Sequence, residues 1–448
     1  MADPANLALM PEPRSKGGAL YSLAERIARY RERAGDAHPV IGSIAPGPDA
    51  VRLFSNDYLG LSGDARINAA KAEALLGTAN EVLMSAVYLH DDSNQRRFER
   101  RMAAFLGAED SVLCQSGWCA NVGLLQTIAD QNTPIFLDLA AHASLWEGAQ
   151  SAGAPLRPFR HNNVNHLEEQ VRRHGPGIVV VDAIYSTAGD LCPIFDLVDF
   201  CEREGCALVV DESHSIGTFG ARGEGLVSML GLTKRVAFRT FSLSKAFAGR
   251  GGIVAGAADA LDFFRFESRP AILSSAVLAY EIVGFERTLD IIQDEYWRRE
   301  ALQRNADRLR TALHDLGYNV SSSQCQIIPL EAGDETRTGS LRDMLDRRGI
   351  FGSVFCMPAT LRNRALVRFS VTSALEPHEL QRTVAACAEI REAIGLADWP
   401  STKRRARAEE REDKETAQTK LRQALVLRPD FGRNANGPSG GGLERFAE

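Results

Sequence analysis

FRTFSLSKAFAGRGG, residues 238–252, is the stretch that decides the fold, because an apolar run ends there on a lone lysine between serines and glycines. The apolar part predicts a buried strand, and Lys245 follows its end. An amine in that position can trap a carbonyl group, although most lysines after a serine-rich strand are solvated surface residues. The stretch therefore indicates catalysis only together with a second motif.

The second motif is VVDESHS, residues 209–215, in which another predicted strand ends on Asp-x-x-His. Asp211 offers a carboxylate to the nitrogen of a pyridine-type ring, and His214 offers an imidazole to a ring substituent. Pyridoxal phosphate (PLP) uses a lysine that forms a Schiff base and a carboxylate that pairs with the ring nitrogen. A strand-end aspartate alone often caps a helix. The two motifs together predict a PLP enzyme.

The composition is that of an ordinary globular protein, with 448 residues, 44% hydrophobic and 25% charged. A formal net charge of −6 argues against a nucleic-acid-binding protein. No apolar stretch is long enough to cross a bilayer, and no signal-peptide pattern begins the chain. The eight cysteines form neither a disulfide framework nor a zinc pattern. We therefore expect a cytoplasmic protein with reduced cysteines and no metal site.

The segment from about 105 to 257 alternates short apolar runs with helical stretches, which is the rhythm of an open α/β sheet. Continuous Val, Ile and Leu runs favour parallel strands that are covered on both faces. The expected strands are 111–115, 134–138, 177–185, 206–211, 237–242 and 251–256, and helices such as 166–174 and 197–205 lie between them. A ligand is then expected at the carboxyl ends of the strands.

Four regions are expected along the chain. They are an N-terminal arm and helix (1–50), a large cofactor-binding domain (51–290), a small C-terminal domain (291–398) and a charged tail, disordered or weakly helical (399–448). The helix of the arm should cover 22–35, and a long helical stretch covers 277–316. The small domain should contain strands near 324–331, 352–357 and 365–371 and close with a helix over 377–395.

Three further segments supply candidates for the same pocket. QSGWCANVGLLQTI, residues 115–128, predicts a strand, a tight turn and a helix, so that amides around Gly117 would bind an anion such as phosphate. An ordinary capped helix is the alternative. His142 follows a strand and could stack on a flat ring, and Ser186 follows another strand end. GTFGARGEG, residues 217–225, looks like a dinucleotide fingerprint but opens no clear helix, so NAD binding is rejected.

Seven motifs occur in the order found in the α-oxoamine synthases, a family of fold-type I PLP enzymes. They are NDYLGL (56–61), QSGW (115–118), HASLW (142–146), DAIYSTAGD (182–190), VVDESHSIGTFGARGEG (209–225), SLSKAF (242–247) and VRFSVTS (367–373). The chain resembles this family over about residues 45–395. The resemblance implies an α/β fold, with a mostly parallel central sheet in the large domain and a smaller C-terminal α+β domain.

The resemblance also implies an acyltransferase that joins an amino acid to an acyl-CoA thioester and releases carbon dioxide. Within the family the chain is most similar to the cholera-type quorum-sensing autoinducer synthases, which make long-chain α-aminoketones. The biosynthetic branches usually carry a glycine-rich segment where this chain has LMSAVYLHDDSN, residues 83–94. That departure argues against biotin, haem or threonine-degradation chemistry. The amino substrate stays open between a short aliphatic amino acid and S-adenosylmethionine.

Three alternatives to the hypothesis of an autoinducer synthase remain open. The first is another α-oxoamine synthase, making 8-amino-7-oxononanoate or, as a serine palmitoyltransferase, a long-chain sphingoid base. The second is an aminotransferase or lyase on the same fold, which the SLSK and NDYLGL segments disfavour. The third is a cofactor-binding regulator without turnover.

Roles of single residues are implied where this sequence matches the family's motifs. Lys245 would form the imine with PLP and later act as a base, and Asp211 would pair with the ring nitrogen. His214 would hydrogen-bond the ring oxygen, and His142 would stack on the ring face. The other implied cofactor contacts are Gly117, Trp118, Ser186 and Ser242, together with Ser274 and Ser275, which would reach the phosphate from the neighbouring subunit of a homodimer.

The resemblance implies that different residues bind the two substrates. Arg368 matches the arginine that holds the substrate carboxylate, for which a planar bidentate guanidinium is suited. An arginine on an apolar strand otherwise needs a buried partner. Residues 83–89, Phe351, Val354 and Phe355 are candidates for the lining of an apolar acyl tunnel, although ordinary core packing explains them equally well.

Overall fold

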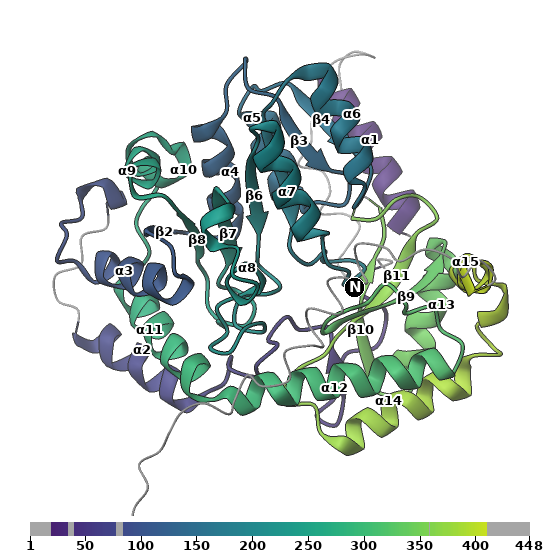
Figure 1. Ribbon diagram of the computed structural model, residues 1–448. Helices are drawn as coiled ribbons and strands as arrows, with labels where there is room; N and C mark the ends of the chain where they lie inside the picture. The colour runs from purple at the N-terminus through teal and green to yellow at the C-terminus, as the bar shows by residue number, and fades with distance from the viewer. Residues whose placement is uncertain (1–18, 35–39, 78–83, 358, 410–448) are drawn as a thin grey trace, which may run out of the picture.

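The computed structural model describes residues 19–34, 40–77, 84–357 and 359–409, and it contains two sheets (Figure 1). The larger sheet has the strand order β2-β8-β7-β6-β5-β3-β4. Its strands are β2 (Asp110–Cys114), β3 (Ile135–Asp138), β4 (Leu156–Phe159), β5 (Ile178–Asp182), β6 (Ala207–Asp211), β7 (Phe238–Ser242) and β8 (Gly252–Gly256). The pairings from β4 to β7 are parallel, whereas β8 runs antiparallel to β7 and β2. The mostly parallel central sheet expected from the sequence is confirmed.

Both faces of this sheet are buried, as the continuous apolar runs predict. Along β5, Val179 and Val181 join one hydrophobic cluster while Ile178 and Val180 join the other, because successive side chains point to opposite faces. One cluster lies under helices α4 (Gly117–Ile128), α5 (Ala143–Ser151), α9 (Ala258–Glu267) and α10 (Arg269–Ile272). The other includes side chains of α3 (Asn94–Leu106), α6 (Val164–His174) and α7 (Ile194–Glu204).

The smaller sheet has the order β1-β10-β11-β9. Its strands β9 (Ile327–Gly333), β10 (Ile350–Phe355) and β11 (Ala365–Ser370) lie close to the three ranges expected, and α13 (Glu335–Asp346) and α14 (Pro377–Ile390) accompany them. Strand β1 (Val51–Leu53) pairs in parallel with β10. These three residues begin the range 51–290 expected for the large domain, yet their hydrogen-bonding partner lies in the C-terminal part of the chain.

The stretch expected to be helical over 277–316 forms two helices, α11 (Ala279–Asp294) and α12 (Tyr296–Asp315). The break falls at Glu295, whose backbone leaves the helical region and whose carboxylate binds Arg66 and Arg298. Helix α11 packs on α2 (Ala65–Gly77), and α12 packs on α14 under the small sheet (Figure 1). The two helices thus link the two parts of the molecule.

The ends of the described chain differ in part from expectation. Helix α1 (Ala19–Ala34) confirms the helix predicted over 22–35, and residues 1–18 lie outside the described residues. Residues Pro400–Glu409 form helix α15, in which Ser401 donates to the carbonyl of Glu331 at 2.6 Å. The tail predicted from residue 399 thus begins with a helix packed on β9, while residues 410–448 lie outside the described part. Within the described residues no helix combines the length and apolarity that a bilayer crossing requires.

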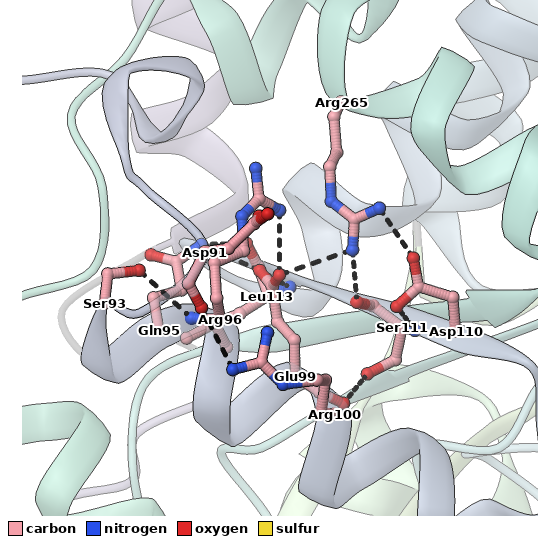
Figure 2. Close-up of polar contacts among 10 residues, drawn as sticks. All are labelled: Asp91, Ser93, Gln95, Arg96, Glu99, Arg100, Asp110, Ser111, Leu113 and Arg265. Atoms are coloured by element: carbon pink, nitrogen blue, oxygen red, sulfur yellow. Dashed lines mark hydrogen bonds and ion pairs between the residues drawn. The ribbon is translucent and has the colours of Figure 1, made fainter.

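The buried carboxylate of Glu99 holds strand β2 of the large sheet in place (Figure 2). Glu99 on α3 is 1% exposed, and its Oε1 accepts from the amide of Leu113 and from Gln95, each at 2.9 Å. Its Oε2 accepts from Arg96 at 2.9 Å and lies 3.4 Å from Arg265 of α9. Strand β2 is thereby held between α3 and α9, and β2 leads directly into α4.

Replacing Glu99 with alanine should lower the free energy of unfolding by about 3 kcal/mol, because two half-buried guanidinium groups would lose a buried charged partner. Chemical denaturation monitored by circular dichroism measures the change. The exposed helical Glu73 provides the matched control, and Glu73→Ala should change stability by less than about 0.5 kcal/mol. Equal effects of the two substitutions would contradict the role given to Glu99.

Candidate active site

The carboxyl ends of three neighbouring parallel strands place the candidate residues at one edge of the large sheet. Asp182 ends β5, Asp211 ends β6 and Ser242 ends β7. The register sets Asp182 opposite Asp211, and Asp211 opposite Thr240. This is the edge at which an open α/β sheet binds its ligand.

Asp211 is buried, at 4% exposed, and two hydrogen bonds hold its carboxylate in place. Its Oδ2 accepts from Asn121 Nδ2 at 2.7 Å, and its Oδ1 accepts from the amide of Ser213 at 2.8 Å. Asn121 is itself fixed by Thr240, whose hydroxyl donates to Asn121 Oδ1 at 2.5 Å. A buried carboxylate with these partners keeps its orientation, which suits an anchor for a protonated ring nitrogen.

His142 lies in the wall of the same site. It is the N-cap of α5, and its Nδ1 lies 2.8 Å from the hydroxyl of Ser144, which in turn accepts from Asn121. The ring of Trp118 meets the His142 ring edge-on at 6.3 Å between centroids. His142 is exposed to solvent in part, and burial of the rest of its ring lowers its pKa. The charge of Asp211 opposes that shift, and the charge of Lys245 adds to it.

Lys245 follows β7 and is half-buried. Burial lowers the pKa of its amine, the charges of Asp211 and Asp182 oppose that shift, and the charge of Arg368 adds to it. These interactions place Lys245 among the residues expected to surround it. An amine with a lowered pKa is more often neutral, and only a neutral amine attacks a carbonyl or accepts a proton.

His214 is 5% exposed, and its Nδ1 lies 2.7 Å from the hydroxyl of Tyr58. Burial lowers its pKa well below the usual value, and the charges of Lys245, Arg368 and His142 add to that effect. The imidazole is therefore neutral near pH 7. Tyr58 belongs to the NDYLGL segment, whose role the sequence did not reveal.

Arg368 is a buried cation without a carboxylate partner in the part of the chain that the structure describes. It is 4% exposed, donates to the carbonyl of Ser186 at 2.8 Å and to Asn56 Oδ1 at 2.9 Å, and lies 4.5 Å from the centroid of the Phe355 ring. Its Nε has no hydrogen-bond partner among the residues that the structure describes. Burial lowers its pKa, although a guanidinium stays charged at neutral pH. A buried charge left in this state is suited to an anionic ligand.

The N-terminus of α4 meets the end of β7 closely. A Cβ on Gly117 would lie 2.7 Å from Cβ of Ser242, so only glycine fits there. Ser116 caps the helix by accepting from the amide of Cys119 at 3.1 Å. The first amides of a twelve-residue helix and the Ser242 hydroxyl thus face a common region, as an anion site requires.

These features together pass a test for PLP, because each part of that cofactor finds a suitable group. Asp211 could pair with a ring nitrogen, neutral His214 could hydrogen-bond a ring oxygen, and Lys245 could attack an aldehyde. The amides at Gly117 could bind a phosphate. Among the described residues no group of three or more His, Cys, Asp or Glu side chains could hold a metal ion, and no disulfide is present.

Two groups of candidates lie on the surface of the single chain. Ser274 and Ser275 are exposed beside Leu273, which is 78% exposed. The acyl-tunnel candidates of residues 84–89 pack beside them, since the amide of Ala276 donates to the carbonyl of Met84 at 2.7 Å. Residue 83 lies outside the described residues. Of the other tunnel candidates, Phe351 is buried, whereas Val354 and Phe355 are half-buried near Arg368.

A buried ion pair stands directly behind Asp211. Glu212 and Arg239 are 0% and 2% exposed and form a salt bridge. Arg239 also donates to the carbonyl of Glu224 at 2.8 Å, and a Cβ on Gly225 would lie 2.7 Å from Glu212 Oε1. The glycine segment 217–225 is thus tied to Glu212, which follows β6, and to Arg239 within β7.

Sequence reasoning missed four residues that position the site, namely Asn56, Tyr58, Asn121 and Thr240. Asn121 left a signal, because it is the buried polar residue of the apolar helix α4. Such a residue needs a hydrogen-bonding partner, and a partner at a strand end would be functional. The other three left no comparable signal, because their partners lie far away in the sequence.

Comparison with known proteins agrees with this architecture. Residues 48–386 match the aminotransferase class I and II family, which defines the class as PLP-dependent transferases. The CAI-1 autoinducer synthase of Vibrio campbellii is 44% identical over 352 residues, which cover 79% of this chain and 89% of that protein. A putative 8-amino-7-oxononanoate synthase of Halalkalibacterium halodurans is 31% identical over 369 residues, 79% of this chain and 92% of that protein.

Among solved structures, a serine palmitoyltransferase of Sphingomonas wittichii matches with a TM-score of 0.78 at 24% identity, covering 85% of this chain and 99% of that one. At that identity the match concerns the fold. The chain belongs to the α-oxoamine synthases, within the aminotransferase class I and II family. It is thus a PLP-dependent enzyme with the fold-type I architecture.

A second charged group, made of two buried carboxylates and a partly exposed histidine, lies beside the site. His161 bridges two carboxylates, Asp138 at the end of β3 (2.9 Å) and Asp190 (2.7 Å), and its ring stands edge-on to Tyr185. Burial alone would lower the pKa of His161, but the hydrogen bonds to Asp138 and Asp190 outweigh it and raise this pKa to about 10.

Because the folded-state pKa of His161 is raised, its contribution to stability is complete below its usual value of 6.5 and is lost as the pH rises through about 10. The difference in free energy of unfolding between the wild type and His161→Gln should therefore shrink steadily over this interval. Urea denaturation at several pH values measures it. The exposed His174 is the control, and His174→Gln should follow the wild-type profile. A difference that stays constant with pH would contradict the assignment.

Proposed function

We propose that the enzyme condenses an amino substrate with a long-chain acyl-CoA and releases carbon dioxide, giving a long-chain α-aminoketone that serves as the precursor of a quorum-sensing autoinducer. The observation that carries the reaction class is the buried, carboxylate-free Arg368 in the same site as Lys245 and Asp211. The 44% identity to a CAI-1 autoinducer synthase supports the particular product. A cytoplasmic location fits the proposed use of acyl-CoA.

Each proposed role follows from the geometry of the side chain. Arg368 binds the carboxylate of the amino substrate with its guanidinium, while Asn56 and the Ser186 carbonyl fix the orientation of that guanidinium. Nζ of Lys245 accepts the proton from the substrate α-carbon, which its lowered pKa allows. When bound, PLP supplies an electron sink that stabilises negative charge on that carbon.

The overall reaction exchanges one bond for another at the α-carbon. A carbon–carbon bond forms between the α-carbon and the thioester carbonyl, and CoA leaves as a thiol. The bond to the carboxyl group then breaks, carbon dioxide leaves, and a proton takes its place.

The remaining residues hold the cofactor in this proposal. Asp211 pairs with the ring nitrogen, His214 donates to the ring oxygen and His142 covers one ring face. Ser186 contacts the cofactor, and phosphate contacts come from Gly117, Trp118 and Ser242, joined by Ser274 and Ser275 of a second subunit. The exposure of Ser274, Ser275 and Leu273 supports a homodimer in which that surface meets the partner.

A second candidate is the synthesis of 8-amino-7-oxononanoate, which the 31% identity to a putative synthase of that compound favours. Serine palmitoyltransferase activity has the support of fold similarity. An aminotransferase would release no CoA. Mass spectrometry of products formed from acyl-CoAs of graded length, with short amino acids or S-adenosylmethionine, distinguishes these reactions.

We expect purified protein to bind PLP, to release CoA in the presence of both substrates and to form an aminoketone. Lys245→Ala should lower this turnover by about 10³-fold or more, because the base is lost, while PLP still binds noncovalently. Borohydride reduction followed by peptide mass spectrometry should find PLP attached to Lys245 in the wild type. Normal turnover by Lys245→Ala, or labelling of another lysine, would overturn the assignment.

Arg368→Ala should raise KM for the amino substrate by about 10- to 100-fold, which corresponds to the loss of a charge-assisted hydrogen-bonded pair. KM for acyl-CoA should change little. Steady-state kinetics with each substrate varied in turn measures both values. Arg364 precedes the same strand and is exposed, so Arg364→Ala is a suitable control. Equal increases in both KM values for Arg368→Ala would remove its proposed role.

A further inference from the structure

The hydrogen bond between Tyr58 and His214 joins two segments that are distant in the sequence and both buried. The Tyr58 side chain is 0% exposed, and its hydroxyl lies 2.7 Å from Nδ1 of His214. The second possible partner of that hydroxyl is Asn56 Oδ1, at 3.3 Å. Asn56 Oδ1 already accepts from Arg368 at 2.9 Å. The distance to His214 is the shorter one, and Asn56 Oδ1 is already occupied by Arg368. Both observations favour donation from the Tyr58 hydroxyl to Nδ1 of His214.

The placement of protons supports the same direction. Burial, with a smaller opposing effect of Arg368, raises the pKa of Tyr58, so the phenol keeps its proton. Burial, with the charges of Lys245, Arg368 and His142, leaves His214 neutral near pH 7. Tyr58 is affected by Arg368, by Cys325 and by a hydrogen bond with the side chain of Gln326. A neutral imidazole has one N–H and one acceptor nitrogen, so the partner of the first nitrogen determines which nitrogen carries the proton.

The pair is also fixed through the main chain. Gln326 donates to the carbonyl of His214 at 2.8 Å, and the amide of Ser373 donates to the carbonyl of Tyr58 at 2.8 Å. Both anchoring residues flank strands of the small sheet. These two hydrogen bonds hold the main chains of Tyr58 and His214 in position, so the Tyr58 hydroxyl stays within hydrogen-bonding distance of the imidazole.

We propose that Tyr58 is a positioning residue that donates its hydroxyl proton to Nδ1 of His214 and so holds the imidazole as the Nε2–H tautomer. That tautomer presents a donor to the ring oxygen of PLP, whereas the opposite tautomer would present a lone pair to it. The inference rests on the cofactor-contacting role proposed for His214, and it is independent of the identity of the acyl acceptor.

The test is ¹⁵N NMR of protein labelled at its nine histidines, prepared without PLP. His214→Gln identifies the His214 signals. In the wild type Nδ1 should show the shift of an unprotonated ring nitrogen and Nε2 that of a protonated one. In Tyr58→Phe the two shifts should move toward each other, because both tautomers become populated. A protonated Nδ1 in the wild type overturns the proposal even if the variant does not fold.

Tyr318 supplies a matched control, because it is also 0% exposed and donates its hydroxyl to the carbonyl of Cys387 at 2.9 Å. Tyr318→Phe removes a comparable buried hydrogen bond within the small domain and should leave the His214 signals unchanged. Unchanged His214 signals in a folded Tyr58→Phe protein would also overturn the proposal.

A second readout uses the protein loaded with PLP. In Tyr58→Phe the pH midpoint of the cofactor absorbance should rise, because the ring oxygen loses a hydrogen-bond donor, and kcat should fall by about fivefold, the size expected for one hydrogen bond. KM for the amino substrate should change less than kcat. An unchanged midpoint contradicts the inference. If the NMR result is as expected but no acyl-CoA is consumed, the proposed reaction fails and the role of Tyr58 stands.

Discussion

The parallel register of β5, β6 and β7 is the constraint on which the site depends. It sets the carboxylates of Asp182 and Asp211 opposite each other and places Thr240 beside them. Two buried carboxylates repel, and burial followed by the charge of Asp211 raises the pKa of Asp182 well above its usual value. The surroundings of Asp182 therefore disfavour its charged form, whereas Asp211 accepts hydrogen bonds from Asn121 and Ser213. A one-residue slip of β6 would turn Asp211 to the other face of the sheet.

The charges at the site balance only in part. The charge of Asp211 acts on the amine of Lys245, while the Arg368 guanidinium has carbonyl and amide oxygens as partners. A substrate carboxylate bound at Arg368 would supply the missing negative charge. Because the guanidinium is already buried in the folded protein, part of the desolvation that binding requires has already occurred. The neutral imidazoles of His142 and His214 keep additional positive charge out of the region.

Much of the fold follows from local patterns. Strands β5, β6 and β7 were predictable because each is a continuous apolar run, and the residues at their ends were predictable because strand ends converge. Strand β4 escaped prediction because Pro158 lies within it, which an edge strand tolerates. Strand β1 has three residues, and its partner β10 is not visible locally. Asn121, Tyr58 and Thr240 act through hydrogen bonds between distant segments, which no local pattern records.

The pairing of β1 with β10 also bears on the order of events during synthesis. Val51 leaves the ribosome early, but Ile350, its partner, follows only after the entire large sheet has been made. The nascent chain therefore carries residues 51–53 without their partner strand while the central sheet assembles. Tyr58 lies five residues beyond that strand, so the cofactor pocket can be completed only when the last quarter of the polypeptide arrives.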